Sequence, residues 1–115
     1  IDNIRTYLDG KVSLCCITQD MLKGLGLEDS ETDGMTNVVR RLEGSVVSVT
    51  MRQLSDGTIR VSLRSECDFN VADVAACFGG GGHVRAAGCS LDGEPAEAIE
   101  RIVSVISEKW NKTEK

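Results

Sequence analysis

The residues best suited to chemistry are a run of glycines and the chain's only histidine, Gly79-Gly80-Gly81-Gly82-His83. Because glycine lacks a β-carbon, such a run can adopt left-handed backbone conformations and direct several N–H groups at one anion. A flexible connection between two elements is the alternative. Four glycines cost about 1 kcal/mol each in chain entropy relative to alanine, which argues for a use. The run therefore predicts a phosphate or nucleotide site.

The segments on either side of the glycines favour the same interpretation. Asn70 is placed to cap a helix, and Gly79 is a natural stop for it. Residues 83–87 are compatible with a short helical turn, whose free N–H groups would face the glycine amides. His83 and Arg85 would then add side-chain donors at the entrance of the site.

A predicted hairpin precedes this region and carries much of the positive charge. Apolar and polar residues alternate over 45–54 and again over 59–64, around an Asp-Gly turn. One face of the hairpin is predicted to enter the core and the other to be cationic. A solvated face whose arginines only promote solubility is the alternative. We expect a ligand face, because Arg52, Arg60 and Arg64 fall on matched faces of paired strands.

The rest of the chain shows the periodicities of an α/β domain. A helix from Pro95 has an apolar stripe that ends at Trp110, which is predicted to pack in the core. The other expected elements are the end of a helix over 1–9, a buried strand over 11–18, a short helix over 19–25, an acidic loop over 28–36, a short helix over 36–42, a helix over 70–78 and a strand over 88–91.

Size and cysteine usage limit the class of protein. At 115 residues the chain is one domain around a single core. It begins with Ile1 rather than Met, so we expect a domain cut from a longer protein. No apolar run approaches the roughly 20 residues of a membrane span. Five cysteines without a CxxC pair favour reduced thiols in the cytoplasm.

Charge and ligand spacing narrow the choice of partners. The net charge of −5 argues against a protein that coats nucleic acid through bulk electrostatics. Arginines nevertheless dominate over 40–64, so a local cationic face is available. A zinc site has little support, because the spacing of its candidate ligands matches no zinc knuckle or ribbon. Those candidates are Cys67, Cys77, His83 and Cys89.

Three stretches resemble the DHH-associated domain that follows the catalytic domain in DHH-family phosphoesterases. They are Val61-Ser62-Leu63-Arg64-Ser65, the segment from Val71 to Phe78, and Gly79-Gly80-Gly81-Gly82-His83-Val84-Arg85-Ala86-Ala87-Gly88. Glu31-Thr32-Asp33-Gly34 and Arg41-Leu42-Glu43-Gly44 also resemble the NrnA-like branch, the bifunctional oligoribonucleases that dephosphorylate adenosine 3′,5′-bisphosphate. The resemblance spans roughly residues 11–108.

The resemblance implies an α/β fold, a mixed β-sheet flanked by helices, over residues 11–110. The end of a linker helix over 1–10 would precede it, and a tail over 111–115 would follow. A separate N-terminal DHH domain would hold two metal ions, usually manganese. Carried over position by position, the substrate-binding residues are Arg64, Ser65, Gly79, Gly80, Gly81, Gly82 and His83. We add Arg60 and Arg85 from their faces and spacing.

These expectations define a function and its alternatives. One histidine, with the carboxylates in an irregular loop, does not make a two-metal site, so the isolated chain should bind no metal, have no catalytic residues and hydrolyse nothing. The leading hypothesis is a cytoplasmic module, with no membrane partner, that presents short single-stranded RNA or DNA oligonucleotides, or a nucleoside bisphosphate, to the DHH domain of the same protein. The alternatives are a packing module without affinity of its own, the same role in a RecJ-like exonuclease or a cyclic-dinucleotide phosphodiesterase, and an autonomous enzyme that uses His83 as acid or base.

Overall fold

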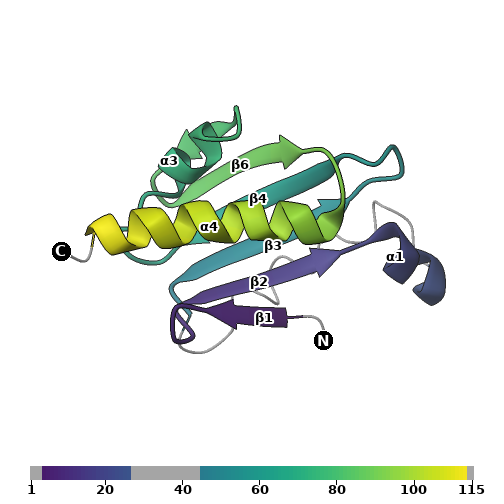
Figure 1. Cartoon of the computed structure of the whole chain (residues 1–115), viewed down its shortest axis with the longest axis horizontal. Coiled ribbons are helices and arrows are strands. Elements are labelled where there is room, and N and C mark those ends of the chain that lie inside the picture. The colour runs from purple at the N-terminus through teal and green to yellow at the C-terminus, as the bar shows by residue number, and fades with distance from the viewer. Residues whose placement is uncertain (1–3, 27–44, 114–115) are drawn as a thin grey trace.

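A six-stranded sheet forms the centre of the computed structural model, which describes residues 4–26 and 45–113 (Figure 1). The order of strands across the sheet is β1-β2-β3-β4-β6-β5. Strands β2 and β3 are parallel, and the other neighbouring pairs are antiparallel. The predicted α/β fold with a mixed sheet is confirmed. The elements are β1 (Ile4–Tyr7), β2 (Val12–Ile17), α1 (Gln19–Leu25), β3 (Val47–Gln53), β4 (Ile59–Ser65), α3 (Val71–Ala76), β5 (Gly81–His83), β6 (Ala86–Leu91) and α4 (Pro95–Thr113).

The first element is a strand where the end of a helix was predicted. Residues 4–7 pair antiparallel with β2. Leu8 and Asp9 then take positive φ angles of 54° and 57°, which turn the chain back on itself within a few residues. The prediction of a helix over 1–9, and of a linker helix over 1–10, is therefore wrong for residues 4–7. The short spacing of apolar residues in this segment is compatible with a helix or with a strand. Pairing with the edge of β2 makes residues 4–7 a strand.

The next two elements agree with the sequence analysis. Strand β2 is buried at every position. Helix α1 starts after Thr18, whose side chain accepts a hydrogen bond of 3.2 Å from the Met21 N–H, and it ends at Gly26 with φ of 71°. The predicted acidic loop over 28–36 and helix over 36–42 lie outside the described residues.

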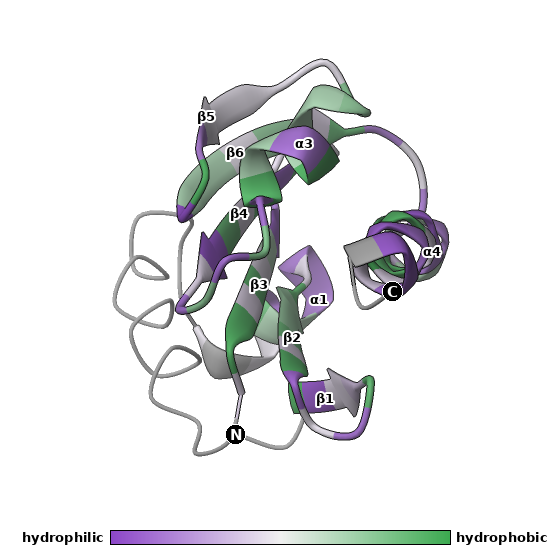
Figure 2. Cartoon of the chain, turned by 90° about the vertical axis from the view of Figure 1, so that its left-hand side faces the viewer, coloured by the Kyte–Doolittle hydropathy of each residue, from purple (hydrophilic) through white to green (hydrophobic). Residues whose placement is uncertain are grey.

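One face of the sheet holds the core, and α3 and α4 both cover it (Figure 2). The alternating apolar residues of the hairpin, Val47, Val49, Met51, Ile59, Val61 and Leu63, all point to this face and are buried. Ile102 and Ile106 of α4 pack against them, as the apolar stripe predicts. Trp110 packs on Phe69 with ring centroids 5.3 Å apart, which confirms its role as a packed anchor. Of the described helices, none is long and apolar enough to cross a membrane.

The opposite face of the sheet changes character from one side to the other. Near β2 it is closed: Ser13, Ser48 and Thr50 are buried, and Leu22 of α1 packs on Cys15 and Ile17. Towards β4 and β6 the residues of the same face become exposed and include arginines. The predicted cationic face therefore exists over part of the sheet.

Candidate anion-binding groove

The glycine run leads from the end of α3 to the edge of the sheet. Gly79 takes φ of 81°, and its N–H donates to the Ala76 carbonyl at 3.2 Å. The Gly80 N–H donates to the Ala75 carbonyl at 2.9 Å. Together these bonds form the Schellman motif that ends many helices, so Gly79 is the helix stop that the sequence predicts. The first two glycine amides are thus satisfied inside the protein.

The remaining glycines form a strand and a tight turn. Gly81–His83 pairs with β6, with His83 opposite Ala86, so that two residues join the strands. The prediction of a short helical turn over 83–87 is wrong. The turn is fixed from behind, because its two carbonyls accept hydrogen bonds of 2.9 Å from the Val71 and Ser65 N–H groups. Those carbonyls belong to Val84 and Arg85 respectively.

Close approach between β5 and β6 explains two of the glycines. A β-carbon at Gly80 would overlap the Gly88 carbonyl oxygen. At Gly82, which has φ of 147°, a β-carbon would lie 2.5 Å from the Ala86 carbonyl oxygen. Neither contact is tolerated by a packed structure, so the backbone pairing itself requires glycine at both positions.

Gly81 differs from its three neighbours. Its φ is not positive, and a β-carbon added to it would meet nothing within 4 Å. The fold described here would accept alanine at this position. The space next to Gly81 therefore belongs to the surface of the protein, where a ligand can use it.

Side chains on the outer face of β4 surround that space in three rows set by the sheet register. In the middle row, Ser62 lies opposite Gly88, which in turn lies opposite Gly81. This row has almost no side-chain volume. One flanking row joins Arg52, Arg60 and Ser90, and the other joins Ser48, Arg64, Ala86 and His83.

Two adjoining hollows follow from this arrangement. The larger, of about 470 Å³, contains Arg52, Arg60 and Ser90 in its lining, and the smaller, of about 310 Å³, contains Arg64 and Ala86. Both share the middle row of Ser62, Gly81 and Gly88. Within the described residues, no carboxylate lines either hollow. We call the two hollows together the arginine groove.

The groove brings together only part of the predicted site. Arg60, Arg64 and all four glycines line it. His83 is exposed at the end of β5, beside Ala86. Ser65 points to the opposite face, is 4% exposed and donates a hydrogen bond of 3.1 Å from its hydroxyl to the Cys67 carbonyl. Arg85 lies in the turn.

Arg85 is absent from the groove lining, whereas several small residues that were not predicted are part of it. The Arg85 guanidinium is 3.9 Å from the Asp68 carboxylate, and both side chains are well exposed. Ser62, Gly88 and Ser90 line the groove but were not predicted as site residues, and Arg52 was predicted only as part of the cationic face. The alternation in the hairpin already placed Ser62 and Arg52 beside Arg60 and Arg64. The register with β6 could not be read from the sequence.

Comparison with known proteins places this arrangement in a family. The profile of the DHHA1 domain matches residues 12–112. The chain belongs to the DHHA1 domain family. Over 94 residues it is 36% identical to the bifunctional oligoribonuclease and PAP phosphatase NrnA of Thermus thermophilus, which covers 81% of this chain and 28% of that protein. The predicted resemblance to a DHH-associated domain of the NrnA-like branch is confirmed.

Solved structures share the fold of this DHHA1 domain. An exopolyphosphatase-related protein from Bacteroides fragilis superposes with a TM-score of 0.84 at 24% identity, over 98% of this chain and 33% of that one. The pGpG-specific phosphodiesterase PggH from Vibrio cholerae gives a TM-score of 0.60 at 15% identity, over 93% of this chain and 35% of that one. The domain thus spans about a third or less of each of these relatives.

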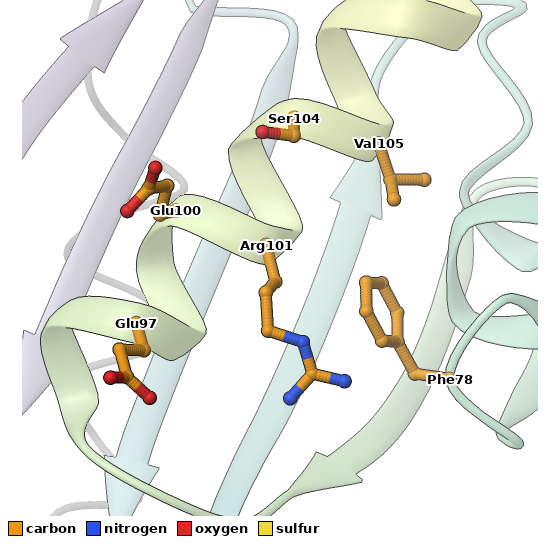
Figure 3. A pocket seen from close by; sticks show the side chains of 6 residues that line it. All are labelled: Phe78, Glu97, Glu100, Arg101, Ser104 and Val105. Atoms are coloured by element: carbon orange, nitrogen blue, oxygen red, sulfur yellow. The ribbon is translucent and has the colours of Figure 1, made fainter.

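A further hollow of about 550 Å³ lies between α4 and the end of α3 (Figure 3) and shares Phe78 with the larger hollow of the arginine groove. Arg101 extends towards Phe78, and its guanidinium carbon is 5.5 Å from the ring centroid. Glu97 and Glu100 line the same hollow. Because two carboxylates offset the single arginine, this region is less suited to an anion than the arginine groove.

The thiols of the domain lie mostly in the core. No disulfide joins any of the five cysteines. Burial, with a smaller contribution from Cys15, raises the pKa of Cys16 to about 11, and burial also raises the pKa of Cys89. Over the part of the chain that the structure describes, no group of three metal-ligating side chains comes together, so the four residues considered for zinc do not form a site there.

Proposed function

We propose that the arginine groove binds the phosphates of a nucleotide or a short single-stranded oligonucleotide and positions them for hydrolysis by a separate metal-dependent domain. The observation that carries this proposal is Gly81. The fold does not require glycine at this position, yet a side chain there would occupy the space between the arginines. A ligand that lies against the backbone gives the missing side chain a reason.

The charge of the groove supports an anionic ligand. The chain as a whole carries a net charge of −5, whereas the described groove lining contains three arginines and no carboxylate. Arginine is the side chain best suited to phosphate, because its planar guanidinium donates two parallel hydrogen bonds to phosphate oxygens. Ser62 and Ser90 add hydroxyl groups on the same face.

The names of the relatives support a nucleotide as the class of ligand. NrnA is an oligoribonuclease and a PAP phosphatase, and PggH is a phosphodiesterase specific for pGpG. Both act on phosphate esters of nucleosides. The domain matches only 28% of the length of NrnA, so in this proposal the hydrolytic step belongs to a DHH domain elsewhere in a longer protein, with manganese as its metal.

A titration with the isolated domain tests the proposal. We expect a 5′-phosphorylated dinucleotide to shift the amide resonances of Gly81, Gly82 and Arg64, with little change along α4. Arg64→Ala should weaken binding by about 1.5–3 kcal/mol, because one charged hydrogen-bond donor is lost. Isothermal titration calorimetry or fluorescence anisotropy gives the affinities.

The control for this titration is Arg5→Ala, which removes the same charge from β1, at the opposite edge of the sheet from β5. It should leave the affinity unchanged within about twofold. If the parent domain binds no nucleotide, the alternative of a packing module without its own affinity is correct. If Arg64→Ala folds and binds as well as the parent domain, the groove is not the site.

A further inference from the structure

The larger hollow of the arginine groove occupies a gap in the sheet. Strand β5 pairs with β6 only along Ala86 to Gly88, while β6 continues to Leu91. Beyond Gly88 the Gly80 backbone passes close to Cys89, and no described strand covers the rest of this edge of β6. Alternate backbone N–H groups of an uncovered strand face outward. The hollow of about 470 Å³ lies at this gap, with Ser90 in its lining.

Two arginines occupy opposite positions on neighbouring strands next to this gap. Arg52 and Arg60 are directly opposite in the β3–β4 register, and Ser90 is opposite Arg60 in the β4–β6 register. Both arginines and Ser90 line the same hollow. Within residues 4–26 and 45–113, Arg60 is exposed and forms no ion pair. Its guanidinium is therefore available to a ligand.

The distance between the two ends of the groove exceeds the size of one phosphate. Arg60 and Arg64 are four residues apart on the same face of β4, which corresponds to about 14 Å along an antiparallel strand. Between them lie only Ser62, Gly88 and Gly81, whose side chains are small or absent. Arg60 lines only the larger hollow and Arg64 only the smaller one, so two linked phosphates can occupy the two hollows at once across this floor.

We propose that Arg60 and Ser90 form a second anion subsite, which binds a different phosphate of the same ligand from the one held near Arg64. This inference rests on the proposed function and adds a consequence to it. The groove distinguishes ligands by the number of phosphates they carry: a mononucleotide occupies one subsite, and a longer phosphorylated strand occupies both.

The test compares two variants against two ligands. Arg60→Gln and Arg64→Gln are titrated with a nucleoside 5′-monophosphate and with a 5′-phosphorylated trinucleotide. Arg60→Gln should weaken trinucleotide binding by tenfold or more and change mononucleotide binding by less than about twofold. Arg64→Gln should weaken both. Arg5→Gln, which removes the same charge from β1 at the opposite edge of the sheet, should change neither.

Salt dependence provides a second measurement. The logarithm of the binding constant falls as the logarithm of the salt concentration rises. Each lost phosphate contact makes this negative slope shallower by about 0.7 for a single strand. Arg60→Gln should therefore reduce the slope for the trinucleotide by about this amount and leave the slope for the mononucleotide unchanged. Ser90→Ala, which keeps the charge, should weaken only the trinucleotide and leave both slopes unchanged.

The outcomes separate this inference from the proposed function. If Arg60→Gln weakens both ligands equally, Arg60 acts through the general field of the groove and the second subsite does not exist, although the groove still binds nucleotides. If Arg60→Gln weakens neither ligand, the second subsite is likewise excluded. If the parent domain binds neither ligand, both proposals fail.

Discussion

The two faces of the sheet use alternate residues of the same strands for opposite purposes. On the covered face of β4, Ile59, Val61 and Leu63 are buried under helices and fill the space available to them. On the other face, Arg60, Ser62 and Arg64 border a floor that is kept empty. Because neighbouring residues of a strand point to opposite sides, stability and binding can be changed separately by substitutions one position apart.

The largest effect is expected on the covered face. Ile102 of α4 is fully buried, so Ile102→Ala should lower the free energy of unfolding by about 2–5 kcal/mol, through lost burial and the cavity that remains. Chemical denaturation measures this loss. The nucleotide affinity of the folded fraction should stay within about twofold of the parent value. A parallel loss of affinity would show that the two faces are not independent.

The glycines allow the same comparison within one loop. Gly82→Ala should destabilise the domain by about 2–4 kcal/mol, because the added β-carbon would lie 2.5 Å from the Ala86 carbonyl oxygen at a φ of 147°. Gly81→Ala should leave the denaturation midpoint nearly unchanged, since its β-carbon meets nothing within 4 Å.

The same two glycine variants are also compared by their affinity for a nucleotide. Gly81→Ala should weaken nucleotide binding, because the methyl group enters the floor shared by both hollows. Titration of the two folded variants under the same conditions makes the comparison. A Gly81→Ala variant that is stable and binds as well as the parent would contradict the role given to Gly81.

The smallest effect concerns pH. Burial raises the pKa of Cys16 from its usual value of 9.0 to about 11. Between these values the unfolded chain loses the thiol proton while the folded chain keeps it, so stability should fall as pH rises from about 9 to about 11. Denaturation midpoints across this range should fall less steeply in Cys16→Ala. Nucleotide affinity should change little, because arginine keeps its charge.

A Cys16→Ala variant with the same pH dependence as the parent would exclude this thiol as the cause. A matched variant at Cys77 serves as the control, because that side chain is exposed. Its substitution should leave the alkaline loss of stability in place. The core face is thus expected to respond to alkaline pH while the groove does not.

The strands with clear alternation were predictable from the sequence, and so was the part of the groove that they carry. The period of two over β3 and β4 placed Arg60 and Arg64 on one face. Ser65 was assigned to the site through the family resemblance, but it directly follows Arg64 in the strand and therefore points to the opposite face, where it is buried. The alternation of residues along β4 already predicts this orientation of Ser65.

Strand β5 could not be predicted, for a physical reason. A run of glycines has no side chains to pack, and its strand conformation comes entirely from pairing with β6. The close approach of the two backbones at Gly80 and Gly82 became visible only in three dimensions. The same holds for β1, whose residues are positioned by the edge of β2 rather than by their own period.

The anchored turn between β5 and β6 has a consequence for how a ligand arrives. Hydrogen bonds from the Val71 and Ser65 N–H groups hold both of its carbonyls at 2.9 Å, so the turn is tied at once to the start of α3 and to the end of β4. The turn that joins the two groove-lining strands is therefore preorganised. A ligand loses its own internal freedom on binding but does not have to order this turn.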